Sequence, residues 1–180
     1  MTRPLLLFFA AVTCSLLLVS TASAQFAKTG TTQITVGVAA EASISVTAAT
    51  SLTTSGTIFN DYAGQTAFQY KVRTTKVGGS GTVTMKVTGD FSPTGGPSVG
   101  TPPSSGDALT FTSALTGVGS GIPTATPITT TSETNMATFG ANAHSTKTGD
   151  NGTVSWTLTN DPLYETGSYT ATVTFTINAV

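Results

Sequence analysis

Residues 32–48 alternate between apolar and small or polar side chains without a slip, and this period of two constrains the fold more than any other feature of the sequence. The even positions of the run hold Ile34, Val36, Val38, Ala40, Ala42, Ile44 and Val46. A repeat of two is typical of a β-strand whose two faces meet different surroundings. An ordinary strand has about 5–6 residues. The run is therefore one long strand, two strands in series, or a strand that pairs with another molecule.

The same alternation recurs along the chain and predicts an all-β protein. Threonine, which favours strands, is the most frequent residue, and no segment after residue 24 has helical spacing of its apolar residues. Strands are expected at 34–38, 42–47, 57–60, 68–74, 82–88, 108–115, 136–139, 153–159 and 168–177. We expect the strands at 68–74 and 82–88 to form a hairpin, and Gly149–Gly152 to be a tight turn. One apolar side per strand indicates an antiparallel, immunoglobulin-like β-sandwich with essentially no helix in the mature chain.

The first 24 residues have the pattern of a secretory signal peptide: Arg3, an apolar core at 5–19, and small residues before a cleavage site after Ala24. An uncleaved N-terminal anchor is the alternative. Cys14 lies inside the apolar core, so the chain from residue 25 on has no cysteine for a disulfide or a thiolate site. No second apolar run predicts a membrane span. We expect a signal peptide at 1–24, an extended segment at 25–40 and a β-sandwich domain at 41–180, in a secreted protein.

Charged residues make up only 8% of the chain and nearly balance, which argues against a nucleic-acid surface. Lys71, Arg73, Lys76 and Lys86 are interpreted as lying on the solvent faces of two strands. The loop at 88–106 is poor in charged and aromatic residues and is interpreted as a spacer.

The sequence offers little for catalysis, and we expect no enzyme, no cofactor and no metal. His144 stands alone in a loop and is expected to be exposed, and no nucleophile motif accompanies it. Asp150, Asn151 and Asp161 would be ligands of a conceivable calcium site, but turn chemistry explains them more simply. Trp156, between two apolar positions, is expected in the core. For a glycan-binding surface, the candidate exposed aromatic residues are Tyr62 and Tyr164.

Three segments together resemble the subunits of chaperone–usher pili. They are ITVGVAAEASISV at 34–46, FQYKVRTTKVGGSGTVTMKV at 68–87 and ETGSYTATVTFTI at 165–177. The cysteine-free, alpha-class major subunits of the colonization-factor type are the nearest. The resemblance implies that an N-terminal extension completes the sandwich of a neighbouring subunit. The donated side chains would be Ile34, Val36 and Val38, and the last strand, lining the acceptor groove, would carry Tyr169, Val173, Phe175 and Ile177.

The function expected from this is that of a secreted structural or adhesive cell-surface protein, a fimbria- or fibre-type subunit that assembles by β-strand addition. Its partners would be copies of itself or related subunits and a periplasmic chaperone. It would reach the cell surface or the medium, through the periplasm in a Gram-negative cell. The alternative is a self-complete sandwich in which 34–46 pairs within its own sheet, serving as a matrix, surface-layer or glycan-binding module.

Overall fold

The computed structural model describes residues 30–180, so the expected signal peptide lies outside the described residues. The chain divides after Val36, and Gly37–Val180 forms one compact unit, which we call the body. The body contains ten strands and, like the rest of the described range, no helix. No helix among residues 30–180 is long and apolar enough to cross a membrane.

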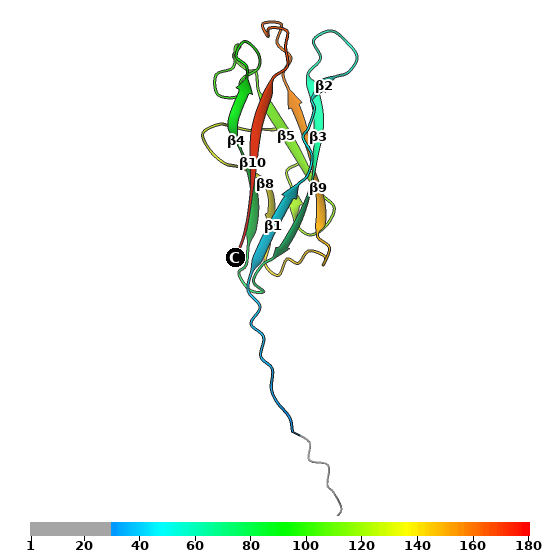
Figure 1. Cartoon of the computed structure of the whole chain (residues 1–180), viewed down its shortest axis with the longest axis vertical. Coiled ribbons are helices and arrows are strands. Elements are labelled where there is room, and N and C mark those ends of the chain that lie inside the picture. Colours follow the sequence, from blue (N-terminus) through cyan, green and yellow to red (C-terminus); the bar gives the residue numbers. More distant parts are fainter. Residues whose placement is uncertain (1–29) are drawn as a thin grey trace, which may run out of the picture. The chain divides into compact units, whose positions relative to one another are not determined.

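Two antiparallel sheets form the body (Figure 1). The first runs in the order β1-β3-β9-β5-β7, with β2 also paired to β3; its strands are β1 (Glu41–Val46), β2 (Thr53–Thr54), β3 (Tyr62–Arg73), β5 (Leu109–Leu115), β7 (Thr126–Pro127) and β9 (Asp150–Leu158). The second runs β10-β4-β8-β6; its strands are β4 (Gly81–Ser92), β6 (Ser120–Gly121), β8 (Thr134–Phe139) and β10 (Thr170–Ala179). The expected antiparallel β-sandwich is confirmed.

The sheet order matches the immunoglobulin arrangement with one position empty. In constant-type immunoglobulin domains, strands A, B, E and D form one sheet and strands C, F and G form the other. Here β1-β3-β9-β5 has the order A-B-E-D, and β4 and β10 take the places of C and F. No strand of the described residues lies where G would pair with β10.

The core lies between the sheets, where the inward residues of each alternating strand meet. Buried side chains there include Phe68, Tyr70, Val83, Met85, Val87, Phe111, Met136, Val154 and Trp156. The expected core position of Trp156 is confirmed: its indole Nε1 donates to Thr66 Oγ1 at 2.8 Å, and its ring packs near Phe111. The inward sides expected from alternation in β3, β4, β5 and β9 are therefore correct.

Three local expectations are wrong. The strands at 68–74 and 82–88 do not form a hairpin, because β3 and β4 belong to different sheets and their connection crosses between the layers. Asp150–Gly152 are not a turn but the first residues of β9, paired with Phe68–Tyr70 of β3. Residues 57–60 form a turn instead of a strand, with Phe59 in a left-handed conformation at φ 57°.

Candidate functional site

The two sheets leave one side of the sandwich open, where their edge strands β1 and β10 lie beside each other (Figure 1). In the described structure, β1 pairs only with β3, and β10 pairs only with β4. The outer edge of each strand therefore has no strand partner. An edge with free N–H and C=O groups is a template for another strand. We call this side of the sandwich, formed by the free edges of β1 and β10, the seam.

Apolar side chains line the seam but are only partly covered. On β10 these are Val173, Phe175, Ile177 and Ala179, and on β1 they are Ala42 and Ile44. The neighbouring strand β4 has the same alternation, yet its Val83, Met85 and Val87 are no more than 2% exposed. The two strands have the same alternation, but the inward side chains of β10 are less buried than those of β4. The inward row of β10 therefore lacks a layer of side chains that would complete its burial.

The seam borders the core. The ring of Phe175 lies 6.5 Å, centroid to centroid, from the ring of the buried Phe68. An apolar side chain placed in the seam would therefore pack on Phe175, which itself packs against the main core. Because apolar burial is worth about 25 cal/mol per Å² removed from water, such a side chain would stabilise the fold.

Of the four residues expected along the acceptor groove, three share the half-buried row of β10: Val173, Phe175 and Ile177. Tyr169 lies just before β10, beyond two register shifts between Thr170 and Val173. Its hydroxyl donates to the backbone oxygen of Glu165 at 2.7 Å, and its ring lies against Gly96. Tyr169 therefore packs on a loop at the end of the strand.

The three expected donor residues are highly exposed: Ile34 by 83%, Val36 by 74% and Val38 by 69%. Residues 30–40 contain no strand, and the first strand of the sheet begins only at Glu41. The alternating run at 32–48 is thus not one continuous strand of its own sheet. Its second part, 41–46, forms β1.

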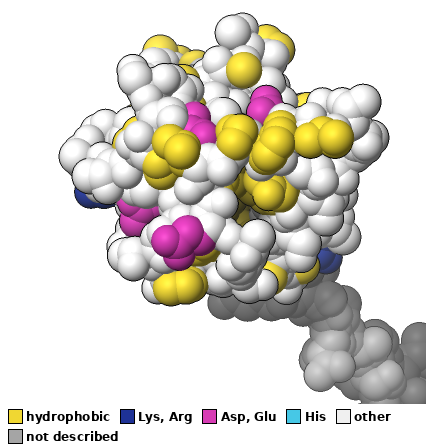
Figure 2. Space-filling view, turned by 90° about the horizontal axis from the view of Figure 1, so that it is seen from above, with side chains coloured by type: hydrophobic (Ala, Val, Ile, Leu, Met, Phe, Trp, Pro, Cys, Tyr) yellow, Lys and Arg dark blue, Asp and Glu magenta, His cyan; other side chains and the backbone are white. Residues whose placement is uncertain are grey.

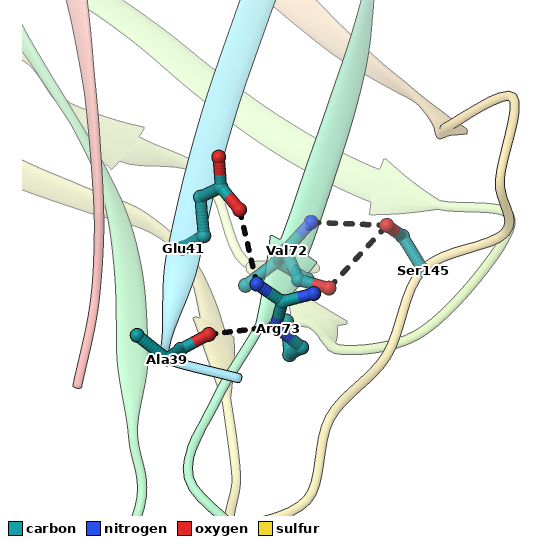
Figure 3. Close-up of polar contacts among 5 residues, drawn as sticks. All are labelled: Ala39, Glu41, Val72, Arg73 and Ser145. Atoms are coloured by element: carbon teal, nitrogen blue, oxygen red, sulfur yellow. Dashed lines mark hydrogen bonds and ion pairs between the residues drawn. The ribbon is translucent and has the colours of Figure 1, made fainter. Parts of the chain in front are cut away.

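Arg73 holds the chain at the point where it enters β1 (Figure 3). Its Nε donates to the backbone oxygen of Ala39 at 2.7 Å, and its Nη2 donates to Oε2 of Glu41 at 3.0 Å. The chain makes no turn or bend between Gly37 and Glu41. The segment before β1 therefore enters the sheet without a turn, and Figure 3 shows Arg73 against Ala39 and Glu41 at this point.

The conceivable calcium ligands are not brought together. The Asp150 carboxylate accepts hydrogen bonds from the amides of Thr146 and Val118 at 3.0 Å each, at the start of β9. Asp161 lies beyond the other end of β9 and accepts the amide of Leu163. Among residues 30–180, no three His, Cys, Asp or Glu side chains gather as a metal site would require.

The remaining candidates have structural surroundings. His144 is exposed, as expected, beside Arg73. Tyr164 is half-buried, and burial and the Asp107 carboxylate, which accepts its hydroxyl at 3.1 Å, raise its pKa. Its hydroxyl is thus already engaged within the fold. Tyr62 is half-buried in β3.

The first residues of the segment 88–106 belong to a strand, because β4 extends to Ser92. Asp90, near the end of β4, binds residues 98–100 of the loop that follows. The Asp90 carboxylate accepts the amides of Val99 and Gly100 at 2.8 and 2.9 Å, and the hydroxyl of Ser98 at 2.7 Å. Burial raises the pKa of Asp90, but these hydrogen bonds outweigh it and hold the pKa below its ordinary value. The segment is therefore more ordered than the spacer that its composition indicated.

One surface feature escaped the sequence reasoning. Ile58, Phe59 and Leu163 are exposed on two loops at one end of the body. The signal for it was available, since apolar residues stand there between turn-forming residues and have no core to enter.

Comparison with known proteins found no similarity that bears on function: no protein-family model, no curated protein and no solved structure matches this chain.

Proposed function

We propose that the protein is a secreted subunit of a cell-surface fibre, assembled when residues 34–38 of one copy enter the seam of another. The observation that carries the proposal is the seam itself. In an immunoglobulin-like sandwich, strand G pairs with strand F, whose place β10 takes here. The described residues provide no strand in the place of G. The proposed role of the protein is structural or adhesive, not catalytic.

The side-chain spacing of the donor segment fits the seam. Ile34, Val36 and Val38 stand at every second position, and so do Val173, Phe175 and Ile177 on β10. Because side chains of adjacent strands meet with the same period, three donated side chains would cover three half-buried ones. Backbone hydrogen bonds to the free edge of β10 would add affinity, as in other cases of β-strand addition.

The entry into β1 without a turn supports donation to a neighbour. To fill its own seam, the segment would have to reverse direction between Val38 and Glu41, and the body has no turn there. Arg73, bonded to both Ala39 and Glu41, stabilises the path of the chain at this point. Donation from each copy to the next is head-to-tail and does not close on itself, so it produces a filament.

The resemblance of three segments to chaperone–usher pilins agrees with this proposal. An open apolar seam on an unassembled subunit is a hazard for aggregation. We therefore propose a periplasmic chaperone that covers the seam until the next subunit arrives. The partners in the fibre are copies of this chain or related subunits.

The test uses the chain from Gln25 and two triple variants. Replacing Ile34, Val36 and Val38 with threonine removes the apolar side of the segment and keeps its strand propensity. The matched control replaces polar positions on the opposite side of the segment instead: Thr31→Ser, Gln33→Ser and Thr35→Ser. Light scattering after size exclusion and negative-stain microscopy measure assembly.

The parent and the control are expected to form filaments, and the apolar-side variant is expected to stay dissociated. A synthetic peptide of residues 30–40, added in excess, should cap the parent and stop its growth. Filaments of the apolar-side variant equal to those of the parent would refute the proposal. So would a parent chain that stays monomeric and gains no stability from the peptide.

A further inference from the structure

An exposed apolar patch lies at the end of the body where β3 begins and β9 ends. It consists of Ile58 and Phe59 in the loop before β3, and Leu163 in the loop after β9. We call it the patch, and this end of the body the loop end. Figure 2, which looks down on the loop end, shows apolar side chains gathered there. Large apolar side chains grouped on a surface mark an interaction site.

The two loops that carry the patch are tied together. The side-chain Nδ2 of Asn160 donates to the backbone oxygen of Asn60 at 3.0 Å, and its backbone N–H donates to Oδ1 of Asp61 at 3.3 Å. Asn60 in turn donates to the backbone oxygen of Ser55 at 2.7 Å. Between these contacts Phe59 holds φ at 57°, a conformation that a bulky residue rarely adopts. The fold thus keeps an aromatic ring, 57% exposed, at a strained position on the surface.

The loop end is acidic. Asp61 and Glu165 are exposed there, Asp90 and Asp107 are half-buried and Asp161 is buried, while none of the described lysine and arginine residues stands in these loops. Figure 2 shows Asp and Glu side chains among the apolar ones, with Lys and Arg only at the margin. A partner for this surface should combine apolar side chains with positive charge.

The opposite end of the body has that combination. Lys71, Arg73, Lys76 and Lys147 lie there, at the end of β3 and in the loops before β4 and β9. Two anionic side chains share this end: Glu41, paired with Arg73, and Asp150, bonded to two backbone amides. Four cationic side chains thus stand against two anionic ones, both of which are already bonded. We call this the basic end.

Apolar groups and a hollow accompany the lysines. Val77 is 87% exposed at the tip of the loop beside Lys76. An open hollow of about 300 Å³ is lined by Val38, Ala39, Ala40, Arg73, Thr74, Thr75, Lys76, Asn142 and His144. The basic end therefore offers a recess with apolar and cationic walls.

We propose that the loop end of one copy docks on the basic end of the next copy, with the patch against the hollow and Val77. This rests on the proposed function, because strand donation supplies the geometry. The strand β10 runs from the loop end to the basic end, since its first residue pairs with Ser92 and its last with Gly81. A donor segment antiparallel to β10 would leave the seam at the loop end.

The connection is short enough to force the contact. Only Ala39 and Ala40 separate the last donor residue, Val38, from Glu41 of the next body. Three residue steps span at most about 11 Å, so the basic end of the donor's body would lie directly on the loop end of the acceptor. A parallel donor would bring two basic ends together instead, which charge disfavours.

Charge reversal tests the contact. Glu165→Lys reduces the negative charge of the loop end, and Lys76→Glu reduces the positive charge of the basic end. The double variant exchanges the signs of these two charges between the ends. Lys86→Glu, in the middle of β4, is the matched control. Assembly of the chain from Gln25 is followed by light scattering in about 50 mM salt, where a Debye length of about 14 Å leaves end charges effective.

Each single end variant is expected to assemble about tenfold more slowly, the double variant to recover to within about threefold, and Lys86→Glu to match the parent. At about 0.5 M salt the differences should vanish, because charges are then screened. End variants that match the parent at low salt, or a double variant slower than both singles, would overturn the docking proposal.

A second measurement separates this proposal from the first. The peptide of residues 30–40 should stop growth of the parent and of every charge variant at the same concentration, because the seam is unchanged. If the peptide stops none of them, strand donation fails. If it stops all of them while charge reversal has no effect, strand donation stands and the end-to-end contact fails.

Discussion

Gly152 shows how one residue was assigned to the wrong structure by local pattern. Asn151-Gly152 has the composition of a hairpin turn, yet Gly152 is in β9, between Phe68 of β3 and Leu115 of β5. A Cβ at this position would lie 2.1 Å from Cζ of Phe68. The glycine is there because an aromatic ring covers its backbone, not because the chain turns.

This contact predicts that Gly152→Ala destabilises the body by about 1–3 kcal/mol, through overpacking against Phe68. Gly140→Ala is the matched control, since a Cβ there would meet nothing within 4 Å, and its cost should stay within about 0.5 kcal/mol. Urea unfolding followed by tryptophan fluorescence measures both. Equal midpoints for the two variants would contradict the prediction.

Asp150 predicts a pH dependence of stability. Hydrogen bonds from Thr146 and Val118 hold the pKa of Asp150 below its ordinary value, although burial opposes them. Because the pKa of Asp150 is lower in the folded state, the unfolded state binds a proton first as pH falls. Protonation then stabilises the unfolded state, and the free energy of unfolding decreases. The contribution of Asp150 is therefore full above the ordinary aspartate range, about pH 4, and is lost as pH falls through the lowered pKa.

We expect Asp150→Asn to lower the urea midpoint at pH 7 and to flatten its decline between about pH 5 and pH 2. Glu133→Gln, an exposed carboxylate before β8, is the control and should keep the decline. A parent-like slope in Asp150→Asn would show that other carboxylates govern the acid limb.

At the scale of elements, β10 and β4 make the clearest comparison. Both alternate apolar and polar residues, and they pair along their length. β4 has β8 on its other side and is buried, whereas β10 has no strand there among the described residues. The position of a strand in its sheet, and not its sequence, decides how protected it is.

Amide hydrogen exchange should report this difference. In the dissociated chain, β10 amides are expected to exchange faster than those of β9, which has neighbours on both sides. In filaments, β10 and residues 34–38 should gain protection, while β9 changes little. Protection of β10 equal to that of β9 before assembly would mean that the seam is already filled.

At the scale of the whole molecule, our proposals assign self-association to two distinct surfaces of the body: the seam along its side and the two ends of opposite character. The seam would supply most of the affinity through apolar burial and backbone bonds, and the ends would set direction and rate. Under these proposals a subunit would polymerise because its donor segment and its seam fit another copy and not each other.

A self-complemented chain tests this view. A copy of residues 30–40 joined after Val180 by a short turn would begin at the basic end and run antiparallel to β10. We expect it to be monomeric and more stable by several kcal/mol, since each buried Ile or Val contributes about 1.5–3 kcal/mol. The same extension with threonine at its three apolar positions is the control, and thermal unfolding with sedimentation velocity measures both. Equal stability of the two chains would argue against the seam as a strand acceptor.

The sequence by itself determined the class of fold and the inward side of most strands, because a period of two follows from backbone geometry alone. The inward row of β10 and the core place of Trp156 were both predicted this way. The candidate donor residues could be named because they continue that period just before the first strand of the body.

Only the tertiary structure decided which strands are neighbours. A period of two carries no information about which strands pair. The sequence pattern therefore predicts a hairpin of β3 and β4, which lie in opposite sheets, and a turn at Gly152, which lies in β9. The open seam, the patch on the loop end and the contrast in charge between the ends each depend on residues far apart in the chain. Long-range packing creates these features, and no local pattern contains it.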